Sequence, residues 1–525
     1  MVNTKLIDTL KITMTRKTYL AIDMGASSGR HLAGHFDGTM LELEELYRYE
    51  NGQTDLAGTL YWNLPSLWSH VQTGLQIAGS KFGNKIVSVG VDTWGVDFAL
   101  LGRGDTLLGN PVCYRDSRTD GMMEQAFKTV SRNDIFRQSG LQFMQFNTLY
   151  QFLAMKQHHS PLLDVAETFL MMPDLFHWLL SGVKSNEFTN ATTTQFFNPT
   201  ENDWAKSLLK MFGLPTDLFL PVSLPGTVLG TLRKNLVLST GLASAKVILP
   251  GTHDTASAVM SVPAKSLQSG NNYSQHSPID WAYISLGTWA LMGIESPKPI
   301  VTEIVSELNF TNEGGVGGTM RILKNICGMW LLQECRRTWN RQGHKGKTGL
   351  PLDWEDLNWL TQAAKPLVSF IDPDAHEFLG PTDMPKAIVE FCRKTGQTVP
   401  ESDGAVLRCA LDSIAMKFRH VLEMCEKISG SRIETIHIVG GGTKNLQLCQ
   451  AAADACGRRV IAGPIEATAI GNIMMQAVAA GDITNIEEAR QIIRSSFEVV
   501  EYLPTAEHVT EWNDAYSRFL AVIGC

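Results

Sequence analysis

Three common signatures are missing from this 525-residue chain. The pattern GxxxxGK[ST] does not occur, which excludes a P-loop nucleotide site. No uninterrupted apolar run approaches the roughly 20 residues of a membrane-spanning helix. The first 17 residues mix polar and apolar side chains and hold no apolar run long enough for a signal-peptide core. We therefore expect a cytoplasmic protein without a membrane partner.

Cysteine and positive charge are also scarce. The nine cysteines are an odd number and form no CxxC pair, so neither a disulfide framework nor a cysteine zinc site is expected. Acidic residues outnumber basic residues by 53 to 45, and the net charge of −8 argues against nucleic acid as a partner. A small anion can still bind, because backbone N–H groups in a turn need no net positive charge.

The chain does contain a mixed α/β pattern, and this pattern occurs twice. The first occurrence predicts strands at 19–23, 31–36, 41–49 and 86–92 and a helix at 62–82. The second predicts strands at 281–286, 290–294 and 433–439, a glycine loop at 440–442 and a helix at 445–456. The length suits two domains, and we place them at 18–258 and 259–490.

Turns of small residues follow the first strand of each half. After Asp23, the run Gly-Ala-Ser-Ser-Gly-Arg would let backbone N–H groups and serine hydroxyls approach a phosphate, while Asp23 itself would hold Mg²⁺. The turn at 285–289 mirrors this one, and its Thr288 would bind phosphate from the opposite domain. Either turn, read alone, is more typical of an ordinary hairpin. The triple glycine at 440–442 does not fit GxGxxG, so it favours a nucleotide contact over a dinucleotide site.

A third turn, at 251–255, carries a carboxylate between a short strand and a helix. Phosphoryl transfer to a hydroxyl needs a carboxylate that accepts the proton, and Asp254 suits this role, with His253 beside it to bind a sugar hydroxyl. A simple helix cap by Asp254 explains the same pattern equally well. Both interpretations stay open at this point.

The segment 90–97 also has two interpretations. Asp92, Trp94 and Asp97 around Gly95 resemble a sugar-binding wall, in which carboxylates accept hydroxyl hydrogens and the indole stacks on the sugar. They are equally typical of a core segment in which the acid ends a strand and the tryptophan fills space.

The order of these motifs resembles that of the FGGY family of carbohydrate kinases, and within it the rhamnulokinase branch. The resemblance covers about residues 19 to 471 and is carried by segments 23–30, 91–98, 251–258, 287–289, 312–315, 324–333, 440–442 and 454–457. It implies an α/β fold of two actin-like (ribonuclease H-like) domains with mixed sheets and an active-site cleft between them. It also implies transfer of the γ-phosphoryl group of MgATP to the O1 hydroxyl of L-rhamnulose, in L-rhamnose catabolism.

The same resemblance implies a role for each site residue. Asp254 would be the catalytic base, and Asp23 would position Mg²⁺. The residues expected to contact the sugar are Gly95, His253, Asp254, Thr255 and Asn325. The residues expected to bind ATP are Ala26, Ser27, Ser28, Gly29, Arg30, Thr288, Gln333 and Gly441.

Two alternatives remain beside this hypothesis. One keeps the kinase but changes the ketose to L-fuculose, L-ribulose or D-xylulose, because specificity rests on a few hydroxyl contacts. The other is a non-catalytic sugar-binding protein on the same fold. Two segments depart from the family pattern: residues 1–17 extend beyond its start, and the loop at 268–280 is longer than the family needs. Neither the effect of that loop nor an oligomeric state follows from the sequence.

Overall fold

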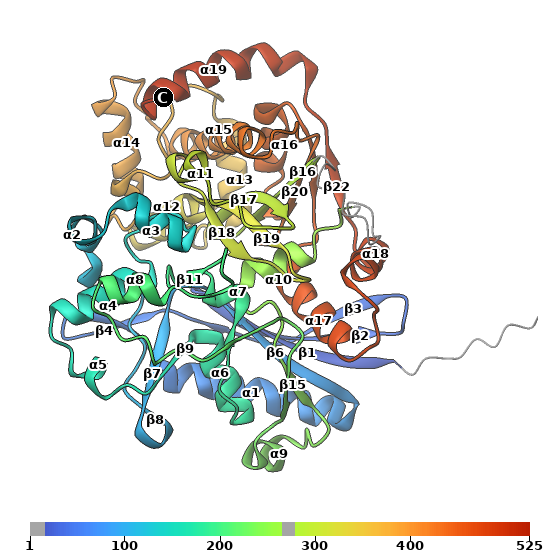
Figure 1. The fold of residues 1–525 in the computed structure, drawn as a ribbon. Helices are drawn as coiled ribbons and strands as arrows, with labels where there is room; N and C mark the ends of the chain where they lie inside the picture. The colour runs from blue at the N-terminus through green and yellow to red at the C-terminus, as the bar shows by residue number, and fades with distance from the viewer. Residues whose placement is uncertain (1–15, 265–278) are drawn as a thin grey trace, which may run out of the picture.

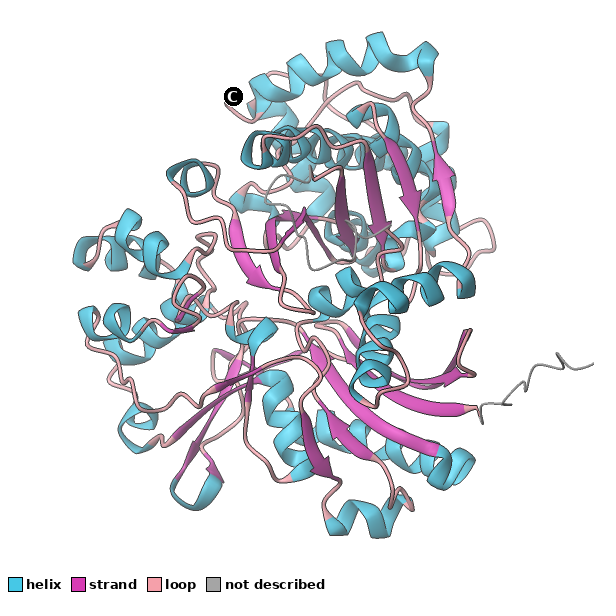
Figure 2. Cartoon of the chain, turned by 45° about the vertical axis from the view of Figure 1, so that its right-hand side comes forward, coloured by secondary structure: helices cyan, strands magenta, loops and turns pink. Residues whose placement is uncertain are grey.

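The computed structural model describes residues 16–264 and 279–525. Almost all of the N-terminal extension and of the long loop at 268–280 therefore lies outside the described residues. Two mixed sheets, each covered by helices, form the two halves of the molecule (Figures 1 and 2). None of the described helices is both long and apolar enough to cross a membrane.

The first sheet has six strands. In spatial order they are β14 (Val228–Thr231), β15 (Lys246–Ile248), β6 (Ile86–Thr93), β1 (Lys17–Met24), β2 (Ser28–Phe36) and β3 (Leu41–Glu50). β1 is antiparallel to β2 and parallel to β6, so the sheet is mixed. Because side chains alternate along a strand, Leu20 and Ile22 of β1 face one layer of helices while Tyr19 and Ala21 face another.

Helix α1 (Leu64–Phe82) covers one face of this sheet and illustrates why the sequence folds as it does. The Asn63 side chain accepts a hydrogen bond from the Ser66 backbone N–H and starts the helix. The buried residues Leu67, Val71 and Leu75 recur at helical spacing. The predicted helix at 62–82 is thus confirmed, with its first two residues outside the helix.

The second sheet has seven strands. In spatial order they are β18 (Thr311–Gly314), β19 (Met320–Cys327), β17 (Trp289–Ser296), β16 (Trp281–Leu286), β20 (Thr435–Val439), β21 (Arg459–Ala462) and β22 (Val500–Tyr502). From β19 onward, the strand directions repeat those of the first sheet read from β3: two antiparallel pairs, two parallel pairs and a last antiparallel pair. The predicted twofold repeat of the architecture is confirmed.

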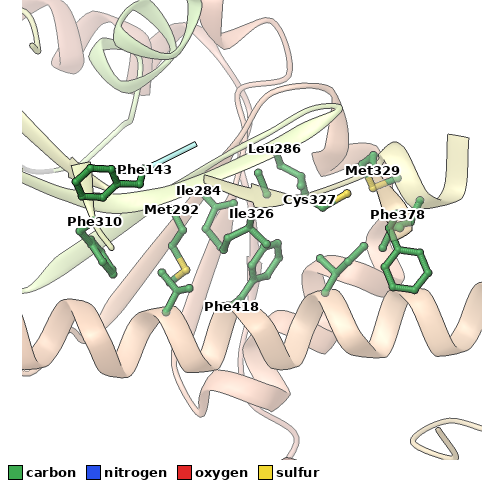
Figure 3. Packing of buried hydrophobic residues seen from close by; sticks show 14 of the residues in the cluster. Phe143, Ile284, Leu286, Met292, Phe310, Ile326, Cys327, Met329, Phe378 and Phe418 are labelled. Atoms are coloured by element: carbon green, nitrogen blue, oxygen red, sulfur yellow. The ribbon is translucent and has the colours of Figure 1, made fainter. Parts of the chain in front are cut away.

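Helices α15 (Asp403–Ser429) and α16 (Leu446–Cys456) form a layer against the second sheet. Ile284, Met292 and Ile326 of the sheet and Phe418 of α15 belong to one buried cluster (Figure 3). Asn445 caps α16 by accepting a hydrogen bond from the Leu448 backbone N–H.

The remaining elements connect or flank the two sheets. The helices are α2 (Met122–Thr129), α3 (Arg132–Ser139), α4 (Thr148–Gln157), α5 (Pro161–Val165), α6 (Met172–Ser181), α7 (Phe188–Ala191), α8 (Lys206–Met211), α9 (Lys234–Thr240), α11 (Glu303–Glu307), α12 (Trp330–Arg341), α13 (Trp354–Ala363), α14 (Met384–Lys394), α18 (Ile486–Ser496) and α19 (Val509–Val522). The short strands are β4 (Gln53–Leu56), β5 (Thr59–Trp62), β7 (Phe98–Gly102), β8 (Thr106–Leu107), β9 (Thr168–Met171), β10 (Asn186–Glu187), β11 (Phe197–Asn198), β12 (Asp203–Trp204) and β13 (Val222–Ser223).

Two helices, α10 (Asp254–Met260) and α17 (Ala467–Ala479), lie between the sheets (Figure 1). They pack so closely that a Cβ on Gly471 would lie 1.8 Å from the Ser257 backbone oxygen. Although α17 follows the second sheet's strand β21 in sequence, it packs on β1 and β6 of the first. Its Asn472 side chain donates to the Gly90 oxygen (3.2 Å) and its Gln476 side chain to the Leu20 oxygen (3.0 Å). Helix α17 thus connects the two halves of the molecule.

Candidate active site

A cavity of about 310 Å³ lies between the two halves of the molecule. The first half lines it with the β1–β2 turn, the segments 94–96 and 141–147 and the start of α10. The second half contributes the β16–β17 turn, β18, β19 and the glycine loop after β20. Segments that are far apart in the sequence therefore meet in one interdomain cleft, as predicted.

The two small-residue turns face this cavity from opposite sides. Ala26, Ser27 and Ser28 line it from the first half, and Gly287 and Thr288 from the second. Neither the Ala26 nor the Ser27 backbone N–H has a hydrogen-bond partner within the described part of the chain. Free N–H groups and hydroxyls in a turn form a site for an anion such as phosphate.

Asn51, at the end of β3, supports the first of these turns. Its side chain donates to the Gly25 oxygen (2.8 Å), and its backbone N–H donates to the Ser27 oxygen (3.1 Å). Two turn carbonyls are thereby held by partners outside the turn. No local pattern predicts this contact, since Asn51 lies 26 residues beyond Gly25.

Arg30 and Asp23 lie beside the first turn as an ion pair. The Arg30 guanidinium donates to one oxygen of Asp23, Oδ2, from Nε (3.1 Å) and Nη2 (2.9 Å), and it also pairs with Glu466. Asp23 Oδ1 has no partner among the described residues, so one oxygen stays available for a cation's water shell. The two carboxylates keep Arg30 charged by raising its pKa against the effect of burial.

Asp254 is the first residue of α10 and lines the cavity. Its Oδ1 accepts hydrogen bonds from the Thr255 backbone N–H (2.6 Å) and hydroxyl (3.2 Å). Oδ2 has no partner within residues 16–264 and 279–525. The side chain is 32% exposed toward the cavity. Burial, with the nearby Asp23 charge, raises the pKa of Asp254 above its ordinary value. A carboxylate with one free oxygen and a raised pKa is suited to accept a proton.

His253 is held against the second half by a buried ion pair. Its Nδ1 lies 3.2 Å from Glu313 Oε2 and 3.1 Å from Arg321 Nη2, and these two partners bind each other at 3.1 Å. The His253 and Arg321 contacts help lower the pKa of Glu313 although burial opposes them. His253 Nε2 lies 3.5 Å from Asp254 Oδ1. The imidazole is thus fixed beside the carboxylate of Asp254.

The segment 90–97 contributes less to the cavity than the sugar-wall hypothesis predicts. Trp94 and Gly95 line it, but Asp92 and Asp97 are fully buried and do not. Asp97 accepts hydrogen bonds from the indoles of Trp62 (2.6 Å) and Trp94 (2.9 Å). The Asp97 carboxylate therefore holds two tryptophan side chains and does not contact the cavity. Both acids are part of the core.

The structure brings most of the predicted residues together. The predicted residues that line the cavity are Asp23, Ala26, Ser27, Ser28, Arg30, Gly95, His253, Asp254, Thr255, Thr288, Asn325 and Gly441. Two predicted residues, Gly29 and Gln333, do not line it. Gly29 lies beneath the turn, where the Tyr49 ring occupies the space of a side chain. Gln333 on α12 contacts the site through the Thr288 hydroxyl, which donates to its Oε1 at 3.4 Å.

Comparisons with known proteins agree with this geometry. The model of the FGGY family of carbohydrate kinases matches residues 18–261 with its N-terminal domain and residues 282–480 with its C-terminal domain. The chain belongs to this family. A rhamnulokinase of Bacteroides thetaiotaomicron is 41% identical over 96% of the chain and 99% of its own length. A rhamnulokinase of Oceanobacillus iheyensis is 39% identical over 92% and 97%.

Solved structures confirm the fold of this FGGY kinase. The crystal structure of gluconate kinase from Lactobacillus acidophilus has a TM-score of 0.77 at 14% identity and covers 97% of the chain and 98% of its own. The FGGY fold of two domains with mixed sheets and helices, similar to actin-like ATPases, is therefore confirmed. At this level of identity the likeness concerns the fold alone.

Several residues of the site were not predicted. Glu313 lies in the Asn-Glu-Gly-Gly motif, which helped to identify the family but suggested no role. Gln142 and Tyr114 line the cavity from segments without a motif. Only the tertiary structure places these side chains at the site.

Proposed function

We infer that this FGGY kinase is an ATP-dependent rhamnulokinase, which converts L-rhamnulose and ATP to L-rhamnulose 1-phosphate and ADP. The observation that carries this proposal is its likeness to curated rhamnulokinases, at 41% and 39% identity over more than nine tenths of their length. The cavity supports it, because Asp254 lines it together with two turns suited to phosphate. Other ketoses and a non-catalytic role are less well supported.

In this proposal Asp254 acts as the base. As the O1 hydroxyl oxygen of the ketose bonds to the γ-phosphorus of ATP, its proton passes to the free Oδ2 and the bond to the ADP oxygen breaks. The hydrogen bonds from Thr255 hold Oδ1 and so fix the direction of the other oxygen. The raised pKa makes the carboxylate a stronger proton acceptor than an exposed aspartate.

The two turns would hold the phosphates. Ala26, Ser27 and Ser28 would bind from one domain and Thr288 from the other, with Arg30 adding charge and Gly441 allowing the nucleotide to approach the backbone. Gly29 and Gln333 would act indirectly, by shaping the first turn and by orienting Thr288.

Asp23 fits the predicted Mg²⁺, since it lines the cavity and its Oδ1 has no hydrogen-bond partner among the described residues. Mg²⁺ in phosphoryl-transfer sites is commonly held by one or two carboxylates together with the phosphates. When bound, it would neutralise phosphate charge. Gly95, His253, Thr255 and Asn325 would contact the sugar.

Two further parts of the proposal concern the whole chain. We propose functional domains at 18–258 and 259–490 that close over MgATP and ketose, which would exclude water from the transfer. We also propose that the enzyme works in the cytoplasm, in keeping with nine free thiols among its described cysteines.

A coupled assay for ADP tests the proposal with purified protein, MgATP and a panel of ketoses. We expect the highest kcat/KM for L-rhamnulose, above L-fuculose, L-ribulose and D-xylulose. A clear preference for another ketose would reject the substrate assignment. If the protein bound a sugar but formed no ADP with any ketose of the panel, the non-catalytic alternative would be favoured instead.

A further inference from the structure

Gln142 forms a hydrogen-bonded bridge across the cleft to Asn325. Its Oε1 accepts from the Asn325 backbone N–H (3.0 Å) and from the Asn325 side-chain Nδ2 (3.1 Å). Gln142 belongs to the first half and Asn325 to β19 of the second, and both line the cavity. The contact therefore joins the two domains inside the candidate site.

This network fixes the orientation of both side-chain amides. A backbone N–H can only donate, so the Gln142 atom that meets it is the oxygen, and the other terminal atom is Nε2. The Asn325 atom that meets the same oxygen is likewise the donor Nδ2, which leaves Asn325 Oδ1 on the other side. Neither amide can be flipped without opposing two like groups.

The two remaining atoms are available to a ligand. Gln142 Nε2 and Asn325 Oδ1 have no hydrogen-bond partner in the described residues. Neither atom is fully buried. A donor and an acceptor thus stand side by side at the wall of the cavity. One hydroxyl group matches both, because its oxygen accepts from Nε2 while its hydrogen points to Oδ1.

Two leucines flank this pair, and hydrogen bonds anchor the segment that carries Gln142. Leu141, next to Gln142, and Leu291, opposite Asn325 in the β17–β19 register, both line the cavity. The segment around Gln142 is anchored, since Asn147 donates to the Gln142 backbone oxygen (2.8 Å) and Asn312 to the Gly140 oxygen (3.0 Å). A donor or acceptor left unpaired when a ligand fills an ordered site is costly, so a ligand that pairs both amides is preferred.

We propose that Gln142 is a substrate-binding residue, which together with Asn325 binds one secondary hydroxyl of the ketose across the closed cleft. The proposal rests on the kinase function above and adds a specificity determinant to it. A ketose that lacks this hydroxyl would leave both amides unpaired. Because the two amides come from different domains, the same hydroxyl would favour the closed arrangement.

Two variants of Gln142 distinguish its hydrogen-bond donor Nε2 from its Oε1, which positions Asn325. Gln142→Met keeps the length of the side chain but removes both polar atoms, and Gln142→Glu keeps an acceptor for Asn325 but removes the donor. We expect both to lower kcat/KM for L-rhamnulose by about 10-fold to 100-fold, the range for one hydrogen bond left unmade in a dry site. KM for ATP should stay near the wild-type value in both variants. The thermal midpoint of unfolding should stay near wild type in Gln142→Glu, which keeps the acceptor for Asn325. Gln138→Glu, on α3 outside the cavity, is the matched control.

A set of monodeoxy ketoses then identifies the contact. Removal of the hydroxyl that the pair binds should lower kcat/KM of the wild type by about 10-fold to 100-fold. The same deoxy sugar should hardly lower kcat/KM of Gln142→Met any further. Wild-type kcat/KM in Gln142→Glu, or equal sensitivity of wild type and Gln142→Met to every deoxy sugar, would overturn the inference. Failure of the wild type to phosphorylate any ketose would instead reject the kinase proposal itself.

Discussion

The two oxygens of Asp254 have different surroundings, and this difference predicts the effect of Asp254→Asn. Oδ1 is held by Thr255, while Oδ2 is free in the cavity. Asparagine keeps the acceptor for Thr255 but cannot take up a proton, so we expect kcat to fall by about 10³-fold. A coupled ADP assay measures this loss, with ATP affinity as the control for an intact site. Turnover within tenfold of the wild type would contradict the assignment of the base.

The same substitution should not destabilise the fold. The raised pKa of Asp254 means that its ionised form is disfavoured in the folded state, so the free energy of unfolding falls as pH rises from the ordinary value of 3.8 through the folded pKa. Asparagine removes this loss. Urea unfolding of Asp254→Asn at pH 8 should therefore give a stability equal to or above that of the wild type, with a smaller difference at pH 4. A less stable variant at pH 8 would show that the carboxylate is a structural cap.

Protonation of Asp254 also predicts the acid limb of the pH profile. The protonated carboxyl cannot accept the hydroxyl proton, so kcat/KM for the ketose should fall with falling pH. Because burial raises the pKa of Asp254, the midpoint of this limb should lie above the ordinary 3.8. Initial rates over pH 3 to 9 at saturating MgATP measure it, after a check that the enzyme stays folded. A midpoint at or below 3.8 would contradict the shift.

At the scale of elements, the conformation of the β1–β2 turn depends on Asn51, the residue that follows β3. Asn51 holds the oxygens of Gly25 and Ser27 in a turn whose Ala26 and Ser27 N–H groups have no partner among the described residues. Asn51→Ala should therefore raise KM for ATP about tenfold, the cost of one lost hydrogen bond, while affinity for AMP and for the ketose stays unchanged. Gln53→Ala, on the exposed strand β4, is the control. Equal losses for AMP and ATP would indicate general misfolding of the turn region.

The elements also show how much the sequence alone could predict. The hairpins around 23–30 and 285–289 and the Asp254 turn follow from local runs of apolar and small residues, so their positions were correct. Gln142, Glu313 and Asn51 act through partners far along the chain, at separations that local patterns do not report. The two interpretations of Asp97 could not be separated for the same reason, because its partner Trp62 lies 35 residues away.

At the scale of the whole molecule, α17 couples the two halves, and its contact with α10 bears directly on catalysis. α10 begins with Asp254, and one turn later Ser257 meets Gly471 of α17. A methyl group at residue 471 would lie 1.8 Å from the Ser257 backbone oxygen, so the two helices would have to separate. Such a displacement would move Asp254 relative to both phosphate turns.

Gly471→Ala should therefore affect stability and turnover together. We expect a loss of about 3 kcal/mol in the free energy of unfolding, the upper part of the usual range for overpacking, because the obstructing atom is backbone. At a temperature where the variant remains folded, kcat should fall about 10² fold, since small misplacements of a catalytic group are costly. Gly380→Ala, whose added methyl meets nothing within 4 Å, should leave both quantities near wild type. If Gly471→Ala lost stability but kept full kcat, α10 would not transmit the displacement to Asp254.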